Sequence, residues 1–158
     1  MPRLDISDNK FLDFDRSRSS NISLVKKGVE RPLQLNIEQA FQMWISLDVI
    51  EAEAERHWAL TNTKDEYKHH LGWNVFLSVV CYKDKLYFDI RQFWMPRGST
   101  KLTPTKSGIR LNRDESQQLR NYKTIISASI PEMEMVEPCD CWSKSTMAST
   151  CERCFAST

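Results

Sequence analysis

The stretch Leu86–Leu119 reads LYFDIRQFWMPRGSTKLTPTKSGIRLNRDESQQL, and its patterns decide the fold of this chain. Its first part alternates between apolar and polar residues up to Phe93-Trp94, which predicts a strand, because neighbouring strand side chains point to opposite faces of a sheet. A basic, proline-containing loop follows, and then a short Gly-Ile-Arg-Leu strand leads into a helix. Aromatic and cationic side chains on a small sheet are typical of proteins that hold an unpaired nucleic-acid strand.

The alternation separates two faces of the predicted strand. The apolar face, suited to packing under a helix, consists of Leu86, Phe88 and Ile90. The other face consists of Lys85, Tyr87, Asp89, Arg91 and Phe93. Arg91 is placed there for contact with a phosphate or a base. The alternative is a surface pair of Arg91 with Asp89, worth under about 1 kcal/mol, and the residues alone leave both interpretations open.

Turn and cap signals bracket this strand. Lys83-Asp84 predicts a two-residue turn, since Asp tolerates turn conformations. Asn112 predicts the N-cap of a helix, and Glu115 stands at the spacing of a capping box. The helix carries an apolar stripe that we interpret as core or dimer seam: Leu119, Tyr122 and Ile126.

Several ordered motifs occur together in the middle of the chain: VVCYKDK at 79–85, DIR at 89–91, FWM at 93–95 and KSGIRLN at 106–112. With these motifs, the segment from about Gly72 to Ile126 resembles the single-stranded-DNA-binding domain of the positive cofactor four family, RNA polymerase II transcriptional coactivators. The resemblance implies an α+β fold, in which a small curved antiparallel sheet is followed by a helix, and a protein that works as a dimer.

The resemblance also implies the residues that bind DNA. Tyr82 and Trp94 are expected to stack on bases, although core packing is the alternative for Trp94. The cations expected on phosphates are Lys83, Lys85, Arg91, Lys101 and Lys106. Two positions depart from the family: Ser107 stands where Lys is common, and Ser116 where the family has a Trp that anchors the helix.

The N-terminal part repeats some of these signals. Lys26-Lys27-Gly28-Val29 and Leu33–Gln39 parallel Lys106–Glu115, with Asn36 as a second N-cap and Gln39 at the capping-box position. The segment Lys10–Arg16 is interpreted as a degraded counterpart of the strand that begins at Lys85. A true repeat would form an in-chain pseudo-dimer instead of a homodimer. The alternative is coincidence, because strand–Asn–helix junctions are common.

Three domains are predicted from these signals: an N-terminal segment 1–71, a single-stranded-DNA-binding domain 72–130 and a tail 131–158. The N-terminal segment is expected to hold a long helix from about Ile37 toward Leu60. The polar stretch Thr61–His70 is expected to be a linker, with His69 and His70 facing solvent.

Four cysteines gather in the tail as a CxC pair and a CxxC pair. Two close pairs of thiolates can bind zinc tetrahedrally, so we expect one zinc ion held by Cys139, Cys141, Cys151 and Cys154. The alternative is a disordered Ser/Thr-rich tail in which the cysteines are incidental.

The distribution of charge supports a phosphate partner. The chain has 158 residues and a net charge of +1. Residues 72–130 hold ten Lys/Arg and four Asp/Glu, a net of +6, whereas the flanking segments are acidic. A basic segment of this kind favours a nucleic-acid partner, and a solvated basic face is the alternative.

The sequence therefore predicts a sequence-tolerant single-stranded-DNA-binding protein, acting as a transcription coactivator or a replication or repair accessory. We expect it in the nucleus with the transcription machinery, with no cofactor required for DNA binding and no membrane partner, since no apolar run approaches the roughly 20 residues of a span. No HExxH, GxGxxG or P-loop motif is present, so an enzyme is not predicted. The alternative function is an adaptor that keeps the fold and recruits proteins through its acidic helix and cysteine tail.

Overall fold

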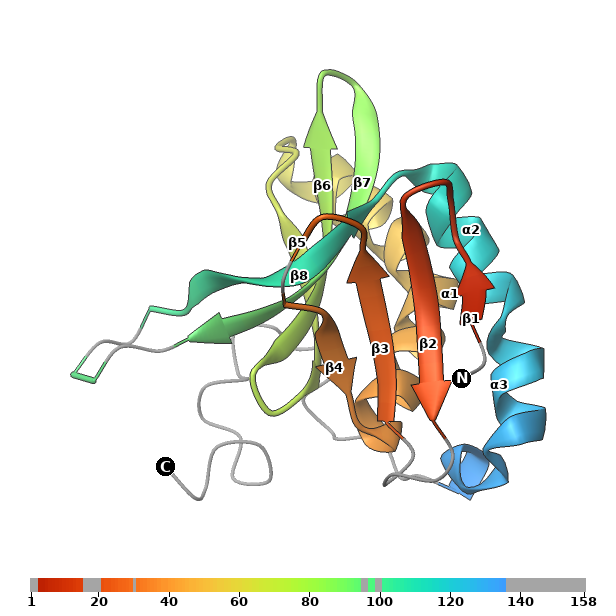
Figure 1. Ribbon diagram of the computed structural model, residues 1–158. Coiled ribbons are helices and arrows are strands. Elements are labelled where there is room, and N and C mark those ends of the chain that lie inside the picture. Colours follow the sequence, from red (N-terminus) through yellow and green to blue (C-terminus); the bar gives the residue numbers. More distant parts are fainter. Residues whose placement is uncertain (1–2, 16–20, 30, 95–96, 99–100, 136–158) are drawn as a thin grey trace.

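The computed structural model describes residues 3–15, 21–29, 31–94, 97–98 and 101–135, which form two antiparallel sheets with helices between them (Figure 1). The first sheet has the strands β1 (Arg3–Asp5), β2 (Lys10–Asp15), β3 (Asn21–Lys26) and β4 (Leu33–Leu35), in that order. The second has β5 (Tyr67–Gly72), β6 (Val75–Tyr82), β7 (Lys85–Trp94) and β8 (Thr103–Leu111). The helices are α1 (Ile37–Thr61), α2 (Arg113–Asn121), α3 (Lys123–Ser129) and the 3-10 helix η1 (Pro131–Met135). The predicted α+β fold is confirmed, and none of the described helices could cross a membrane.

The last strand of each sheet enters its helix through the same kind of junction. The side chain of Asn36 accepts a hydrogen bond from the backbone N–H of Gln39 at 2.8 Å, and that of Asn112 from Glu115 at 2.8 Å. The side chains of Gln39 and Glu115 accept in return from the backbone N–H of the two asparagines. Both predicted capping boxes are confirmed, and each fixes where its helix begins.

The hairpin of β6 and β7 follows the predicted pattern. Lys83 and Asp84 form its two-residue turn with φ of 50° and 62°, the geometry that suits the twist of the flanking strands. Phe88 and Ile90 are buried on the inner face, and Leu86 packs against the same core. The alternation of β7 therefore places the other set of side chains, from Lys85 to Phe93, on the face that points away from the helices.

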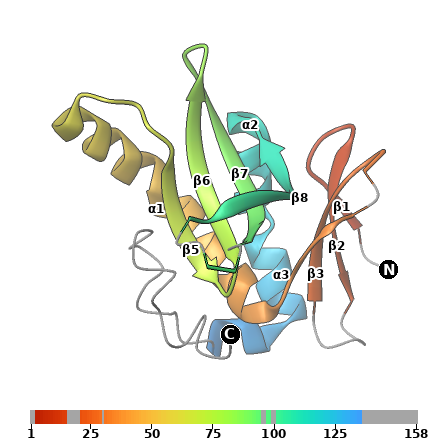
Figure 2. The ribbon, with the colours of Figure 1, turned by 90° about the vertical axis from the view of Figure 1, so that its left-hand side faces the viewer.

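One apolar core is shared by both sheets. It joins Leu12 and Leu24 of the first sheet to Leu77 and Ile90 of the second, and Figure 2 shows α2 and α3 between the sheets. Trp44 of α1, only 1% exposed, donates its indole N–H to the carbonyl of Leu119 at 2.9 Å. A buried Trp thus does contact α2, but α1 supplies it and position 116 does not.

The prediction of a linker over Thr61–His70 is wrong for its last residues. Tyr67–Gly72 forms β5, which pairs with β6, and His69 and His70 are both fully buried. His69 Nε2 lies 2.6 Å from Glu53 Oε2, and His70 Nε2 lies 2.5 Å from the carbonyl oxygen of Trp73. Burial lowers the pKa of both histidines, although these contacts partly oppose the change. Pairing with an apolar strand overrides the polar composition of this segment.

The repeated signals of the two halves match only in part. Each half has four antiparallel strands in sequence order followed by a capped helix, and Asn36 and Asn112 occupy the same place. However, Lys10–Asp15 forms the second strand of its sheet, whereas β7 is the third, so the predicted correspondence between these segments is wrong. Strand order makes β3 the counterpart of β7.

A partly buried ion pair connects the two halves. Lys10 Nζ of β2 lies 2.9 Å from Glu115 Oε1 and donates to the carbonyl of Arg110 at 2.7 Å. The two side chains are 14% and 10% exposed. Burial would raise the pKa of Glu115, but hydrogen bonds from Asn112, Lys10 and Ser7 and the charge of Lys10 outweigh it, and the pKa is lowered.

We predict that Glu115→Gln lowers the free energy of unfolding by about 2 kcal/mol at pH 7, because a charged hydrogen bond is lost. The folded-state pKa of Glu115 lies below the 4.5 of a free glutamate. The carboxylate therefore stabilises the fold above that pH, and this stabilisation disappears as the pH falls through the folded-state pKa. Urea unfolding at pH 7 and pH 3 should show the two proteins converging in acid.

The matched control is Asp114→Asn, which neutralises an exposed carboxylate on the same helical turn. Its cost should be smaller than that of Glu115→Gln. A difference between parent and Glu115→Gln that is the same at both pH values would contradict the role of the charge.

Candidate nucleic-acid interface

The outer face of the second sheet, the side that points away from the helices, carries Tyr82, Lys85 and Arg91 among the predicted binding residues. Register sets Phe76 opposite Arg91, Ser78 opposite Asp89, Val80 opposite Tyr87 and Tyr82 opposite Lys85. On β8, Gly108 lies opposite Arg91 and Arg110 opposite Asp89. On β5, Lys68 and His70 join the same face through their pairing with Ser78 and Phe76.

Several of the predicted residues lie toward the two ends of the β6–β7 hairpin. At the β6–β7 turn, Tyr82 is 58% exposed and Lys83 Nζ lies 5.3 Å from its ring centroid, with Lys85 exposed beside it. At the other end of β7, Trp94 is 59% exposed and pairs with Thr103. A strand of this length places the two ends about 30 Å apart. Trp94 is therefore not a core residue, and the two exposed aromatic rings lie at opposite ends of the β6–β7 hairpin.

The two loop cations lie toward the Trp94 end. Lys101 precedes β8 and is exposed, and Lys106 is exposed within β8, where the pairing with β7 is irregular. Lys85 and Trp94 therefore lie at the ends of β7, and Arg91 lies within it. Lys101 precedes β8 and Lys106 lies in it, while Tyr82 and Lys83 are at the hairpin turn.

A single buried carboxylate organises the centre of the face. Asp89 is 4% exposed, and its two oxygens accept from Arg91 at 2.9 and 3.2 Å. Arg110, on the next strand, donates to the same carboxylate at 3.2 Å. The Arg91–Asp89 pair is thus present, with a second arginine added. Two guanidinium groups on one carboxylate leave a net positive charge at the centre of the face.

The side chain of Arg91 lies flat across Gly108. A Cβ atom on Gly108 would come within 2.7–2.8 Å of three Arg91 side-chain carbons, closer than atoms can pack. Arg91 also donates to the carbonyl of Thr105 at 2.8 Å. Its planar guanidinium is therefore fixed in orientation, which suits a directed contact with a phosphate. Arg110 is less enclosed, with 53% of its side chain exposed.

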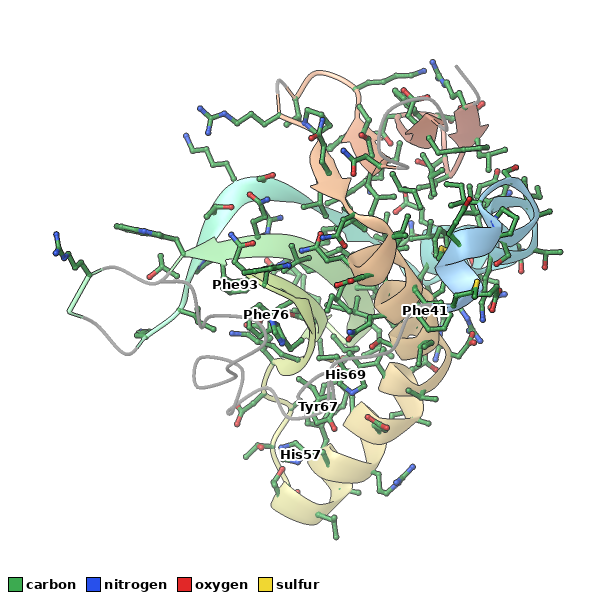
Figure 3. All side chains as sticks on the ribbon, turned by 90° about the horizontal axis from the view of Figure 1, so that it is seen from below. Phe41, His57, Tyr67, His69, Phe76 and Phe93 are labelled. Carbon is green, nitrogen blue, oxygen red and sulfur yellow. The ribbon has the colours of Figure 1, made fainter. Side chains whose placement is uncertain are left out.

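A small aromatic cluster closes part of the face near Trp94. The rings of Phe76 and Phe93 meet edge to face with centroids 5.2 Å apart (Figure 3), and both are buried. The ring of His70 lies 4.9 Å from Phe76, and Lys68 Nζ lies 4.6 Å from the centroid of Phe93. The alternation places Phe93 on the outer face, but its side chain is buried there and packs against Phe76.

Three residues of this region were missed by the sequence analysis. Arg110 follows Gly108 at a spacing of two on a predicted strand, so the alternation alone could have identified it. Lys68 lay in the predicted linker, whose strand was not recognised. Trp73, 45% exposed, lies in the β5–β6 turn with φ of 53°, and its neighbours Gly72 and Asn74 are turn residues that could have marked the position.

The predicted zinc ligands cannot be placed. Cys139, Cys141, Cys151 and Cys154 all lie outside the described residues, so zinc binding stays a prediction. In the described ranges, no group of three or more His, Cys, Asp or Glu side chains could hold a metal ion.

Residues 69–122 match the family model described as Transcriptional Coactivator p15 (PC4). The match covers about a third of the chain, and it runs from β5 to the end of α2, so it includes the outer face with both of its ends. It supports a DNA-binding transcriptional coactivator, and the resemblance drawn from the motifs is confirmed. Residues 69–122 therefore form a domain of the positive cofactor four family.

Proposed function

We propose that this protein is a nuclear transcriptional coactivator that binds single-stranded DNA across the outer face of β5–β8. The observation that carries the proposal is the pair of exposed aromatic side chains, Tyr82 and Trp94, at the two ends of the β6–β7 hairpin, with cations between them. The proposed activity is binding, so no bond is broken and no cofactor is needed.

Exposed aromatic rings distinguish an unpaired strand from a duplex. Stacking of a base on an aromatic side chain contributes about 1–3 kcal/mol and tolerates any base. In a duplex the bases are already stacked on one another and are not available to Tyr82 and Trp94. The cations add a contribution that depends on phosphates and not on sequence.

Two described cations of the first sheet are already engaged with other groups of the protein. Arg3 pairs with Asp5 at 3.1 Å and stacks 4.0 Å above the ring of Phe11. Lys10 turns inward to Glu115. Arg3 is thus paired locally and Lys10 joins the two halves, which favours β5–β8 as the face that takes the strand.

We propose further that the two halves act as an in-chain pseudo-dimer. The apolar stripe of α2 and α3, which was expected to be core or dimer seam, is covered within one chain: Leu119 and Ile126 are fully buried. The other half contributes Trp44 to that packing, and Tyr122 donates a hydrogen bond to the carbonyl of Asp5. A second chain is therefore not needed to bury the stripe.

The pseudo-dimer predicts a monomer in solution. Sedimentation velocity at micromolar concentration should give a mass of one chain, about 18.5 kDa, because the first half already covers the apolar stripe of the second. A stable homodimer that forms through α2 would contradict the pseudo-dimer.

The central prediction concerns the dependence of DNA affinity on salt. With four to five phosphate contacts, the slope of log affinity against log salt should be about −3 for single strands. Arg91→Ala should weaken binding to every sequence and flatten that slope by about one contact's share. Trp94→Ala should weaken binding by about 1–3 kcal/mol without changing the slope. Fluorescence anisotropy with labelled oligo-dT and with a duplex measures both quantities.

Matched controls lie outside the proposed face. Lys27→Ala removes an exposed cation of the β3–β4 turn, and Leu60→Ala removes a side chain that is 82% exposed at the end of α1. Neither should change the affinity by more than about twofold, within the usual effect of surface substitutions. Equal affinity for duplex and single strands would contradict the proposal, and no DNA binding at all would favour the adaptor function.

The contact between Arg91 and Gly108 gives a second test. Gly108→Ala should displace Arg91 from Asp89, because the new Cβ would overlap its side chain. We expect a loss of about 1–3 kcal/mol in stability from overpacking, and a loss of oligonucleotide affinity close to that of Arg91→Ala.

Gly28→Ala is the control for this substitution. Gly28 has φ of 86° and no atom within 4 Å of the added Cβ, so the variant should lose about 1 kcal/mol of stability through backbone strain alone and keep its affinity. If Gly108→Ala bound single strands as tightly as the parent, the orientation of Arg91 would be irrelevant to binding.

A further inference from the structure

An exposed tryptophan stands in an unfavourable backbone conformation at the turn between β5 and β6. Trp73 has φ of 53°, in the left-handed region that large side chains rarely adopt. Its side chain is 45% exposed, so burial offsets little of this strain. Gly or Asn would form the turn more easily. Strained residues that the fold does not require tend to lie at functional sites.

The turn that carries Trp73 is fixed in place on both sides. The carbonyl of Trp73 lies 2.5 Å from Nε2 of the buried His70. The carbonyl of Gly72 accepts from the side chain of Gln39 at 3.0 Å, and that of Asn74 accepts from the backbone N–H of Phe93 at 2.7 Å. Trp73 is thus presented from a rigid base, which lowers the entropy lost when a ligand packs on it.

The last of these hydrogen bonds also locates the turn. Phe93 directly precedes Trp94, so the β5–β6 turn lies beside the end of β7, with Val75 paired to Gln92 just inside it. Two exposed tryptophans therefore stand on neighbouring strand ends, at the end of the sheet opposite Tyr82. Trp73 is therefore an exposed aromatic side chain on the strand end next to that of Trp94.

We infer that Trp73 is a third stacking platform, which takes a nucleobase of the bound strand next to the base on Trp94. This inference rests on the proposed binding of single-stranded DNA. It extends the site from the face of β5–β8 to the turn that joins β5 to β6, and lengthens the stretch of DNA that the protein holds. The ligand is any nucleobase, because every base has a π face.

The test is a series of oligo-dT lengths, from about 4 to about 16 nucleotides, with the full chain. Trp73→Ala should reduce affinity for the longest oligonucleotide about fivefold or more and have less effect on the shortest. The salt slope should not change, because stacking releases no cations. Trp73→Tyr, which keeps an aromatic ring, should retain most of the affinity. Quenching of tryptophan fluorescence by the long oligonucleotide should also decrease in Trp73→Ala.

Trp73→Gly separates a binding role from a structural one. Gly adopts positive φ without strain, so this variant should unfold at the same or a higher temperature and still lose affinity for the longest oligonucleotide. If Trp73→Gly and Trp73→Ala bind every length like the parent while Trp94→Ala is impaired, the inference about Trp73 is overturned and the proposed function stands. If the parent binds no oligonucleotide, both are overturned.

Discussion

Each of the two sheets has an apolar inner face, and the same helices cover both. Burial of apolar side chains is the largest favourable contribution to folding, and here Leu24 and Leu77, on different sheets, belong to one core. The fully buried Trp44 illustrates the consequence, because it follows the first sheet in the chain and contacts the helix that follows the second. Without either half, the apolar side chains of the shared core would be exposed to water. The outer face of β5–β8 therefore depends on the N-terminal half for its stability.

The outer face shows how a sheet can present positive charge in a fixed arrangement. Isolated arginines on a surface are mobile, and ordering them on binding costs entropy. Here the carboxylate of Asp89 orients Arg91 and Arg110, and the absence of a side chain at Gly108 leaves room for Arg91 to lie flat. Asp89 therefore lowers the net positive charge of the face but holds the two guanidinium groups in fixed positions. Fixed cations favour recognition of a ligand that has regularly spaced phosphates.

Local signals in the sequence predicted much of this fold. The alternation of β7, the turn at Lys83-Asp84 and the capping boxes at Asn36 and Asn112 each depend on residues close in sequence, and all are found. What could not be predicted depends on contacts distant in sequence. The polar strand β5 forms only because β6 pairs with it, and the burial of Phe93 requires Phe76 across the sheet. The alternation predicted which face of the sheet each side chain lies on, but not whether that side chain is exposed to solvent.

The two halves share an order of elements but differ in how they use charged side chains. In the first half Lys10 is directed inward to Glu115, and the carboxylate of Glu115 also closes the capping box of α2. The same glutamate thus fixes the start of one helix and binds the other sheet. Where a homodimer must present two equivalent surfaces, a chain with two different halves can use one half to support the other. Lys10 of the N-terminal half thus stabilises the fold that carries the outer face of β5–β8.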